Sequence, residues 1–173
     1  METLDALLER LPDAARDLRL NVKAVLGESS LTPAQTWGTA VACAIAADNA
    51  ELQRAVTEAA RGRVEAPVLD DAVAAASVMG MNNIFYRFRH MVPGYEQIPA
   101  RLRMQRLAKP ATNRVDLELF CLAVSAIHGC EACVRSHEQV VREGGVTEQQ
   151  VHDAVRIAAV LHGAAVSLRA AGT

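Results

Sequence analysis

Residues 113–143, NRVDLELFCLAVSAIHGCEACVRSHEQVVRE, determine how this chain folds, because they contain two helical segments joined at one glycine. In the first segment, apolar residues recur three and four positions apart, as on the buried face of a helix: Leu117, Phe120, Val124 and Ile127. Gly129 interrupts this pattern, and a second segment begins near Cys130 and stops at Gly144 and Gly145. The stretch therefore predicts two successive helices, over about 113–128 and 130–144.

Helix signals of the same kind occur along the rest of the chain. The sequence Thr32-Pro33-Ala34-Gln35 has a threonine cap, a proline in the first turn and a glutamine three positions after the cap. Thr147 and Gln150 form a second capping box, and we find no convincing strand. We expect an all-α fold, a single helical domain over residues 1–173 with eight or nine helices, at about 4–11, 18–27, 33–48, 50–62, 67–90, 101–109, 113–128, 130–144 and 147–169.

Composition and charge favour the same fold and exclude several classes of protein. Alanine, the best helix former, occupies 32 of the 173 positions, whereas aromatic residues occupy only 6. A net charge of −2 argues against nucleic acid or an anionic membrane as the main partner. No uninterrupted apolar run reaches the ~18 residues of a membrane span, and residues 1–11 lack an apolar signal core. We therefore expect a soluble, cytoplasmic protein.

Two parts of the chain resemble each other at an offset of 82 residues. Asp71, Ala72, Val73, Ala76 and Val78 recur as Asp153, Ala154, Val155, Ala158 and Val160. Such self-similarity indicates a duplicated helical unit, although an alanine-rich chain produces some matches by chance. In a duplicated unit, residues 48–51 would correspond to 130–133, and the first copy would lack the cysteines.

The four cysteines fall into two kinds. Cys43 and Cys121 lie in apolar helical stretches, where a cysteine is usually a small buried hydrophobe. Cys130 and Cys133 are three positions apart at a predicted helix start, within reach of each other. The partial positive charge of a helix N-terminus stabilises a thiolate, which is the form that attacks a peroxide or a disulfide.

Two further side chains fit a thiol site around this pair. His137 follows Cys133 by one helical turn, on the same face, where an imidazole can take a thiol proton. Glu118 lies about 16 Å before Gly129 along the first helix, and His137 lies about 12 Å beyond it along the second. If the helices fold back antiparallel, Glu118 therefore arrives beside His137 rather than beside the cysteines.

Plainer interpretations of the same residues exist. The pair Cys130 and Cys133 could be half of a zinc site, but four ligands are needed and the chain has no second CxxC. The two cysteines could also be buried together by chance. Glu118 and His137 taken singly would be ordinary solvated helix residues, and only their joint placement around the CxxC motif points to function.

The sequence resembles the alkyl hydroperoxide reductase AhpD proteins of the carboxymuconolactone decarboxylase-like superfamily. The resemblance rests on Glu118, Cys130-x-x-Cys133 and His137 at these spacings. It extends to three other segments in the same order: Trp37-Gly38-Thr39, Met79-Gly80-Met81-Asn82-Asn83-Ile84-Phe85-Tyr86-Arg87 and Ala123-Val124-Ser125-Ala126-Ile127. The segment from Met79 to Arg87 points to AhpD within the superfamily, although we derive no mechanism for it.

The resemblance implies an all-helical thiol-disulfide oxidoreductase that forms homotrimers or multiples of them. Such a protein has weak alkyl hydroperoxidase activity and mainly re-reduces the peroxiredoxin AhpC, with electrons from a dihydrolipoamide-bearing adaptor protein. It binds no metal and no cofactor of its own. By this analogy Cys133 is the attacking thiol, Cys130 resolves the intermediate to a Cys130–Cys133 redox disulfide, and Glu118 and His137 form a proton relay.

Two features leave alternatives open. Helix-terminus charge favours Cys130 as the more acidic thiol, whereas the neighbouring His137 favours Cys133. We take Cys133 as the attacking thiol, because a specific base outweighs the partial charge of a helix terminus. The residue before the second cysteine is commonly histidine in AhpD proteins, but here it is Ala132, which removes a possible member of the relay. The alternative functions are a non-catalytic oligomeric helical or metal-binding module with a structural CxxC, and a decarboxylase of the same superfamily.

Overall fold

The structure, a computed structural model, describes residues 3–171, and its regular secondary structure over that range is helical, with no strand. Nine α-helices lie within the described residues: α1 (Leu4–Glu9), α2 (Arg16–Gly27), α3 (Pro33–Ala46), α4 (Ala50–Arg61), α5 (Ala66–Met91), α6 (Gln105–Ala108), α7 (Arg114–Ile127), α8 (Glu131–Glu143) and α9 (Glu148–Ala171). A short 3₁₀ turn, Asp13–Ala15, precedes α2. The predicted all-α fold is confirmed, and the predicted span of 1–173 includes four residues outside the described part.

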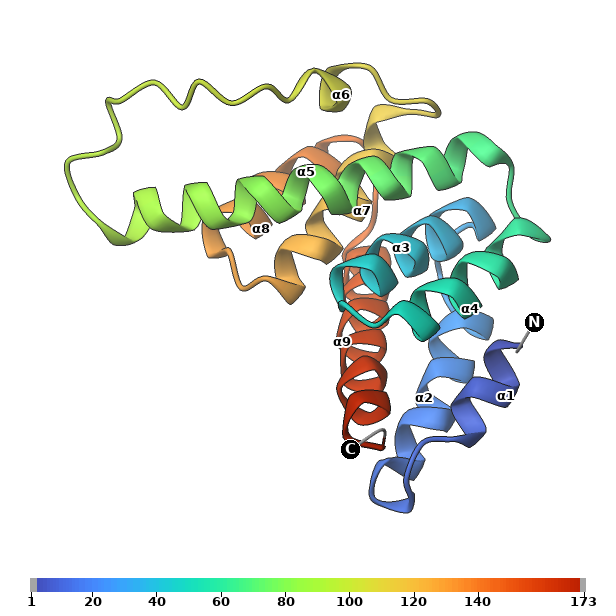
Figure 1. Ribbon diagram of the computed structural model, residues 1–173. Coiled ribbons are helices and arrows are strands. Elements are labelled where there is room, and N and C mark those ends of the chain that lie inside the picture. Colours follow the sequence, from blue (N-terminus) through green and yellow to red (C-terminus); the bar gives the residue numbers. More distant parts are fainter. Residues whose placement is uncertain (1–2, 172–173) are drawn as a thin grey trace.

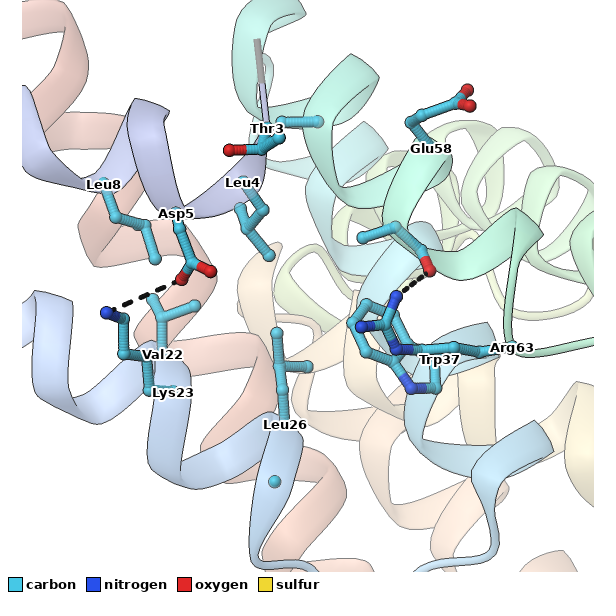
Figure 2. A pocket seen from close by; sticks show the side chains of 13 residues that line it. Thr3, Leu4, Asp5, Leu8, Val22, Lys23, Leu26, Trp37, Glu58 and Arg63 are labelled. Atoms are coloured by element: carbon cyan, nitrogen blue, oxygen red, sulfur yellow. Dashed lines mark hydrogen bonds and ion pairs between the residues drawn. The ribbon is translucent and has the colours of Figure 1, made fainter.

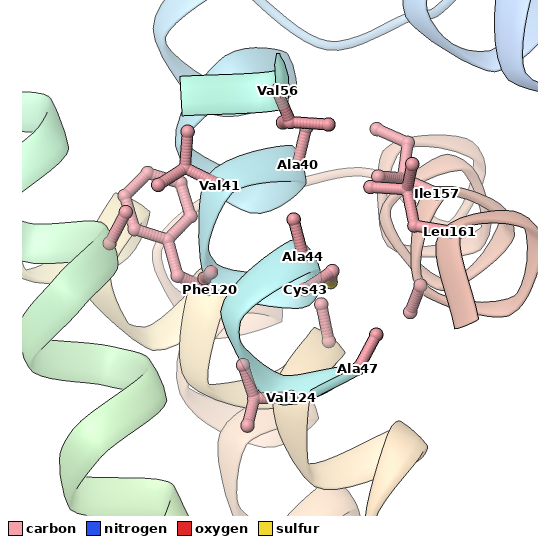
Figure 3. Packing of buried hydrophobic residues seen from close by; sticks show 14 of the residues in the cluster. Ala40, Val41, Cys43, Ala44, Ala47, Val56, Phe120, Val124, Ile157 and Leu161 are labelled. Carbon is pink, nitrogen blue, oxygen red and sulfur yellow. The ribbon is translucent and has the colours of Figure 1, made fainter. Parts of the chain in front are cut away.

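Helices α3 and α7 form the centre of the molecule, and both pack against α5 and α9 (Figure 1). Figure 3 shows α3 between the side chains of α7 and those of α9, with Ala40, Ala44 and Val41 facing these neighbours. Gly38 allows α3 to approach α7 closely, because a Cβ atom at this position would collide with the ring of Phe120. Ala40 and Ala44 are fully buried on the same helix, and their small side chains also let the neighbouring helices approach.

One helix in the described part of the chain, α9, is long and apolar enough to cross a membrane by length and composition. It packs against α2, α3 and α7, and its inward face is buried at Ala154, Ile157 and Leu161. An apolar helix that contacts three neighbours in this way is the core helix of a folded domain. The cytoplasmic location stays a prediction.

The internal similarity has a structural counterpart. Helices α3, α4 and α5 begin 81, 81 and 82 residues before α7, α8 and α9. Asp48, after α3, and Gly129, after α7, both have positive φ, at 53° and 65°. This correspondence aligns 49–52 with 130–133, so the predicted match of 48–51 is wrong by one residue. The cause is that the offset is 81 rather than 82 at the starts of α4 and α8.

Two buried aspartates make equivalent contacts in the two halves. Asp71 on α5 accepts hydrogen bonds from the backbone N–H and the hydroxyl of Thr112, and Asp153 on α9 accepts the same pair from Ser30. Ser30 and Thr112 are themselves 82 positions apart and precede α3 and α7. Burial opposes ionisation, but these hydrogen bonds outweigh it and lower the pKa of both carboxyl groups, that of Asp153 to about 2.

The segment between α5 and α7 departs from the sequence-based expectation. The short helix predicted from Arg101 begins instead at Gln105, and residues 101–104 lie outside any helix. Arg101 has φ of 51°, which is incompatible with a right-handed helix at the predicted start. The loop therefore covers 92–104 and returns alongside α5 (Figure 1).

Candidate functional site

The CxxC motif lies at the start of α8, where the chain turns back from α7. Gly129 has φ of 65°, a conformation that a glycine adopts without strain, and it makes this turn. Cys130 is the N-cap of α8, and its N–H donates to the Ser125 carbonyl across the turn. Cys130 and Cys133 form a disulfide, with their Cα atoms 5.3 Å apart. Cys130 is fully buried, whereas Cys133 is 7% exposed.

His137 and Glu118 meet as the antiparallel arrangement predicted. The Nδ1–H of His137 on α8 donates to Glu118 Oε2 on α7 over 2.6 Å. Both side chains are 13% exposed, so the contact is largely screened from water. Arg114, one turn earlier on α7, lies 3.8 Å from the other carboxylate oxygen. These four sequence-predicted residues, Cys130, Cys133, His137 and Glu118, thus gather where α7 and α8 pack together.

Met79 on α5 completes the surroundings of His137, and sequence reasoning missed it. Its thioether Sδ lies 3.2 Å from His137 Nε2, on the ring nitrogen opposite Glu118. Met79 is 1% exposed. The sequence offered one signal, the position of Met79 at the head of the AhpD-like segment 79–87, but no spacing rule links it to His137.

Two other residues of the segment 79–87, Asn83 and Arg87, contact the turn between α7 and α8. Asn83 is fully buried, accepts a hydrogen bond from the Ser125 hydroxyl and contacts His128 Nδ1 through its amide nitrogen at 3.0 Å. Arg87 donates to the backbone carbonyl of His128. The segment 79–87 therefore fixes the backbone that carries Cys130, which explains its place beside the motif.

His128 is a structural residue rather than a second base. Burial lowers its pKa, and the charges of Arg87 and His162 lower it further, while a hydrogen bond with the Met79 backbone opposes this. A neutral imidazole that accepts from Asn83 at Nδ1 keeps its proton on Nε2. The ring is thus held in one tautomer next to the CxxC turn.

A cavity of about 390 Å³ opens over the disulfide. It is lined by Met79, Asn82, Tyr86, His90, Met104, Ala132, Cys133, Ser136 and His137. Cys133 faces this space, while Cys130 does not line it. Asn82 Nδ2 donates to Met104 Sδ over 2.8 Å and so ties the 92–104 loop to α5 at the cavity. The walls are mostly apolar, and the small side chain of Ala132 lines the cavity together with Cys133.

A larger cavity of about 740 Å³ lies elsewhere, between α1, α2, α3 and α4 (Figure 2). There the guanidinium of Arg63 stacks over the Trp37 ring at 4.7 Å, and Lys23 pairs with Asp5 at 3.5 Å. None of the side chains that line it is a cysteine or a histidine. We place the candidate site at the smaller cavity, because it contains the groups that can exchange electrons and protons.

The other two cysteines are separate from this site. Cys43 and Cys121 are fully buried and free, and burial raises the pKa of both thiols. A buried neutral thiol is a poor nucleophile. Within residues 3–171, no group of three or more His, Cys, Asp or Glu side chains is placed to hold a metal ion.

Comparison with known proteins gives a consistent result. Residues 93–172 match the carboxymuconolactone decarboxylase family. The chain is 64% identical to alkyl hydroperoxide reductase AhpD of Anaeromyxobacter sp. (strain K), over 99% of this chain and 94% of that protein. It is 54% identical to the AhpD of Solibacter usitatus (strain Ellin6076), over 95% and 94% of the two chains. It is 45% identical to the AhpD of Brucella suis (strain ATCC 23445 / NCTC 10510), over 99% of both.

Proposed function

The chain belongs to the alkyl hydroperoxide reductase AhpD family, and on this premise we propose that it is an antioxidant thiol-disulfide oxidoreductase with Cys130 and Cys133 as its redox pair. The observation that carries the proposal is the disulfide at the start of α8, with Cys133 facing a cavity that His137 also lines. Its substrates are an alkyl hydroperoxide and the peroxiredoxin AhpC. Its electron donor is the dihydrolipoamide of an adaptor protein.

Direct reduction of a hydroperoxide proceeds in two steps. The Cys133 thiolate attacks the terminal peroxide oxygen, so that an S–O bond forms, the O–O bond breaks and the alkoxide leaves as the alcohol after taking a proton. Cys130 then attacks the Cys133 sulfenic acid, and water leaves as the disulfide forms. The exposure of Cys133 at the cavity and the burial of Cys130 support this division of roles.

Reduction of AhpC uses the same two sulfurs. The Cys133 thiolate attacks the AhpC disulfide and forms a mixed disulfide, and one AhpC thiol is released. Cys130 then attacks Cys133, which releases the second AhpC thiol and closes the Cys130–Cys133 bond. Dihydrolipoamide returns the pair to the dithiol by exchange in the opposite direction, and it becomes lipoamide disulfide. Two electrons pass in each half-cycle.

Glu118 and His137 form the proton relay of both half-cycles. The imidazole takes the proton of Cys133 before attack and returns it when the thiol is regenerated. Glu118, hydrogen-bonded to Nδ1 over 2.6 Å, orients the ring and stabilises its charged form. No histidine at position 132 contributes, so the relay in this chain depends on His137.

The assembly proposed for this enzyme is a homotrimer. Exposed apolar side chains gather between residues 84 and 98, which supports a role for this surface in subunit contacts: Ile84, Phe88, Met91, Val92, Tyr95 and Ile98. The mass in solution tests this proposal. We expect about 56 kDa, three times the 18.6 kDa of one chain, and a mass of one chain at micromolar concentration contradicts it.

Turnover measurements test the proposed function. The purified chain is mixed with cumene hydroperoxide and dihydrolipoamide, and lipoamide disulfide and alcohol are measured together. We expect equal amounts of both products, and no turnover by Cys133→Ser. Cys43→Ser is the matched control, because it removes a buried free cysteine outside the site and should keep the parent's rate. Turnover by Cys133→Ser at the parent's rate contradicts the proposal.

A further inference from the structure

Met79 makes an unusual contact with the base of the proposed relay. Its Sδ lies 3.2 Å from His137 Nε2 while Cys133 is engaged in the disulfide. We infer that Met79 is a positioning residue, which accepts the Nε2–H hydrogen bond of His137 in the oxidised enzyme and keeps that proton available for Cys133. This inference rests on the proposed function, since it names a state of the same relay.

The chemistry of the two partners fixes where the protons are. A thioether sulfur has no proton to donate and can only accept, so a hydrogen bond between it and Nε2 requires a proton on Nε2. On the other side of the ring, the Glu118 carboxylate can only accept from Nδ1 over 2.6 Å. In the inferred arrangement both ring nitrogens of His137 therefore act as hydrogen-bond donors in the disulfide form.

The charges around the ring agree with this arrangement. Glu118 is the acidic side chain in contact with His137, and Arg114 approaches its far carboxylate oxygen at 3.8 Å. His90 and Tyr86 line the same cavity from α5, and Cys133 and Ser136 line it from α8. In a dithiol site, the Cys133 thiolate would be the partner of Nε2–H. The disulfide removes that acceptor, and Met79 replaces it.

Reduction of the disulfide then gives the Nε2–H of His137 a new acceptor. A donor thiolate attacks Cys133 Sγ, the Cys130–Cys133 bond breaks, and Cys130 leaves with its electron pair and takes the proton of the first donor thiol. The second donor thiol loses its proton to solvent, and its thiolate attacks the mixed disulfide and releases Cys133 as a thiolate. That thiolate pairs with the Nε2–H of His137, which turns from Met79 to Cys133. The donor loses two electrons and the enzyme sulfurs gain them.

Nitrogen-15 NMR of histidine-labelled protein tests the inference on the unsubstituted chain, and a variant serves only to assign the signal. His137 is assigned as the signal that His137→Gln removes, and the parent is then compared after oxidation with hydroperoxide and after reduction with a phosphine, at pH 7. We expect both ring nitrogens of His137 to show protonated shifts in the oxidised protein. An unprotonated Nε2 shift in the oxidised protein overturns the inference, and no folding defect can imitate that result.

A variant pair supplies the kinetic test. Met79→Leu keeps the volume and removes the acceptor, so we expect the Nε2 signal of the oxidised protein to move towards the unprotonated shift. The reduction of its disulfide by dihydrolipoamide should slow by about 3- to 10-fold, which corresponds to one weak hydrogen bond. Met81→Leu is the matched control, a methionine of the same helix that does not line the cavity, and it should leave the His137 shifts unchanged.

The two proposals fail in different ways. If Met79→Leu keeps both the protonated Nε2 shift and the parent's rate of disulfide reduction, Met79 has no positioning role. If the parent's disulfide is not reduced by dihydrolipoamide at all, the proposed electron donor is wrong, whatever the NMR shifts show. Circular dichroism confirms that both variants are folded before either result is used.

Discussion

Replacing Glu118 by glutamine and His137 by alanine should slow the enzyme to clearly different extents. His137→Ala removes the imidazole in contact with Glu118, and a positioned base is typically worth about 10²- to 10⁴-fold in rate. Glu118→Gln keeps a hydrogen-bonding group of the same shape and removes its charge. The difference between a charged and a neutral hydrogen bond is about 1 to 1.5 kcal/mol, which corresponds to about 10-fold in rate.

The assay is steady-state hydroperoxide turnover with dihydrolipoamide at pH 7, for the two single variants and the double variant. Because Glu118 acts through His137, the double variant should be no slower than His137→Ala alone. His152→Ala is the control for the loss of an imidazole, since His152 is an exposed residue of α9 whose side chain is 68% exposed. If His137→Ala keeps most of the parent's rate, histidine is not the base, and Glu118 acting through solvent becomes the better candidate.

Three other predictions follow from the site and the fold. Cys130→Ser should accumulate a mixed disulfide with AhpC on non-reducing gels, because the resolving thiol is gone, whereas Cys133→Ser should form none; exchanged results would exchange the two roles. Ala132→His should fold and turn over hydroperoxide at least as fast as the parent, because position 132 faces the open cavity; a loss of activity would show that the cavity needs a small residue there. Asp153 should contribute about 2 to 3 kcal/mol to stability, because its folded pKa of about 2 lies below the unfolded value of about 3.9. This contribution is present above pH 5 and is lost as pH falls through 3.9 towards 2, so acid denaturation of Asp153→Asn should lack that part of the pH dependence.

The sequence predicted those parts of the fold that depend on local signals. Both capping boxes form as expected, with Gln35 and Gln150 returning to the N–H groups of Thr32 and Thr147. The contact between Glu118 and His137 was also predictable, because distances along two helices from one hinge determine which side chains meet. The geometry of two helices joined at one hinge therefore predicts the contact between α7 and α8 at this site.

The parts that the sequence did not predict depend on contacts between distant segments. Met79 reaches His137 only because α5 crosses α8, and no periodicity in the chain encodes that crossing. The start of α6 at Gln105 depends on the backbone of the 92–104 loop, where Arg101 has a positive φ. The aspartates at 71 and 153 were visible as a repeat, but their role in holding Thr112 and Ser30 appears only in three dimensions.

Thiol-trapping mass spectrometry before and after one equivalent of hydroperoxide tests the central claim most directly. The reduced protein is alkylated, digested and compared with a sample that was oxidised first. The redox-pair account predicts that Cys130 and Cys133 become linked to each other, while Cys43 and Cys121 remain reduced because they are buried. Oxidation of Cys121 with Cys133 still free after peroxide treatment would contradict the account.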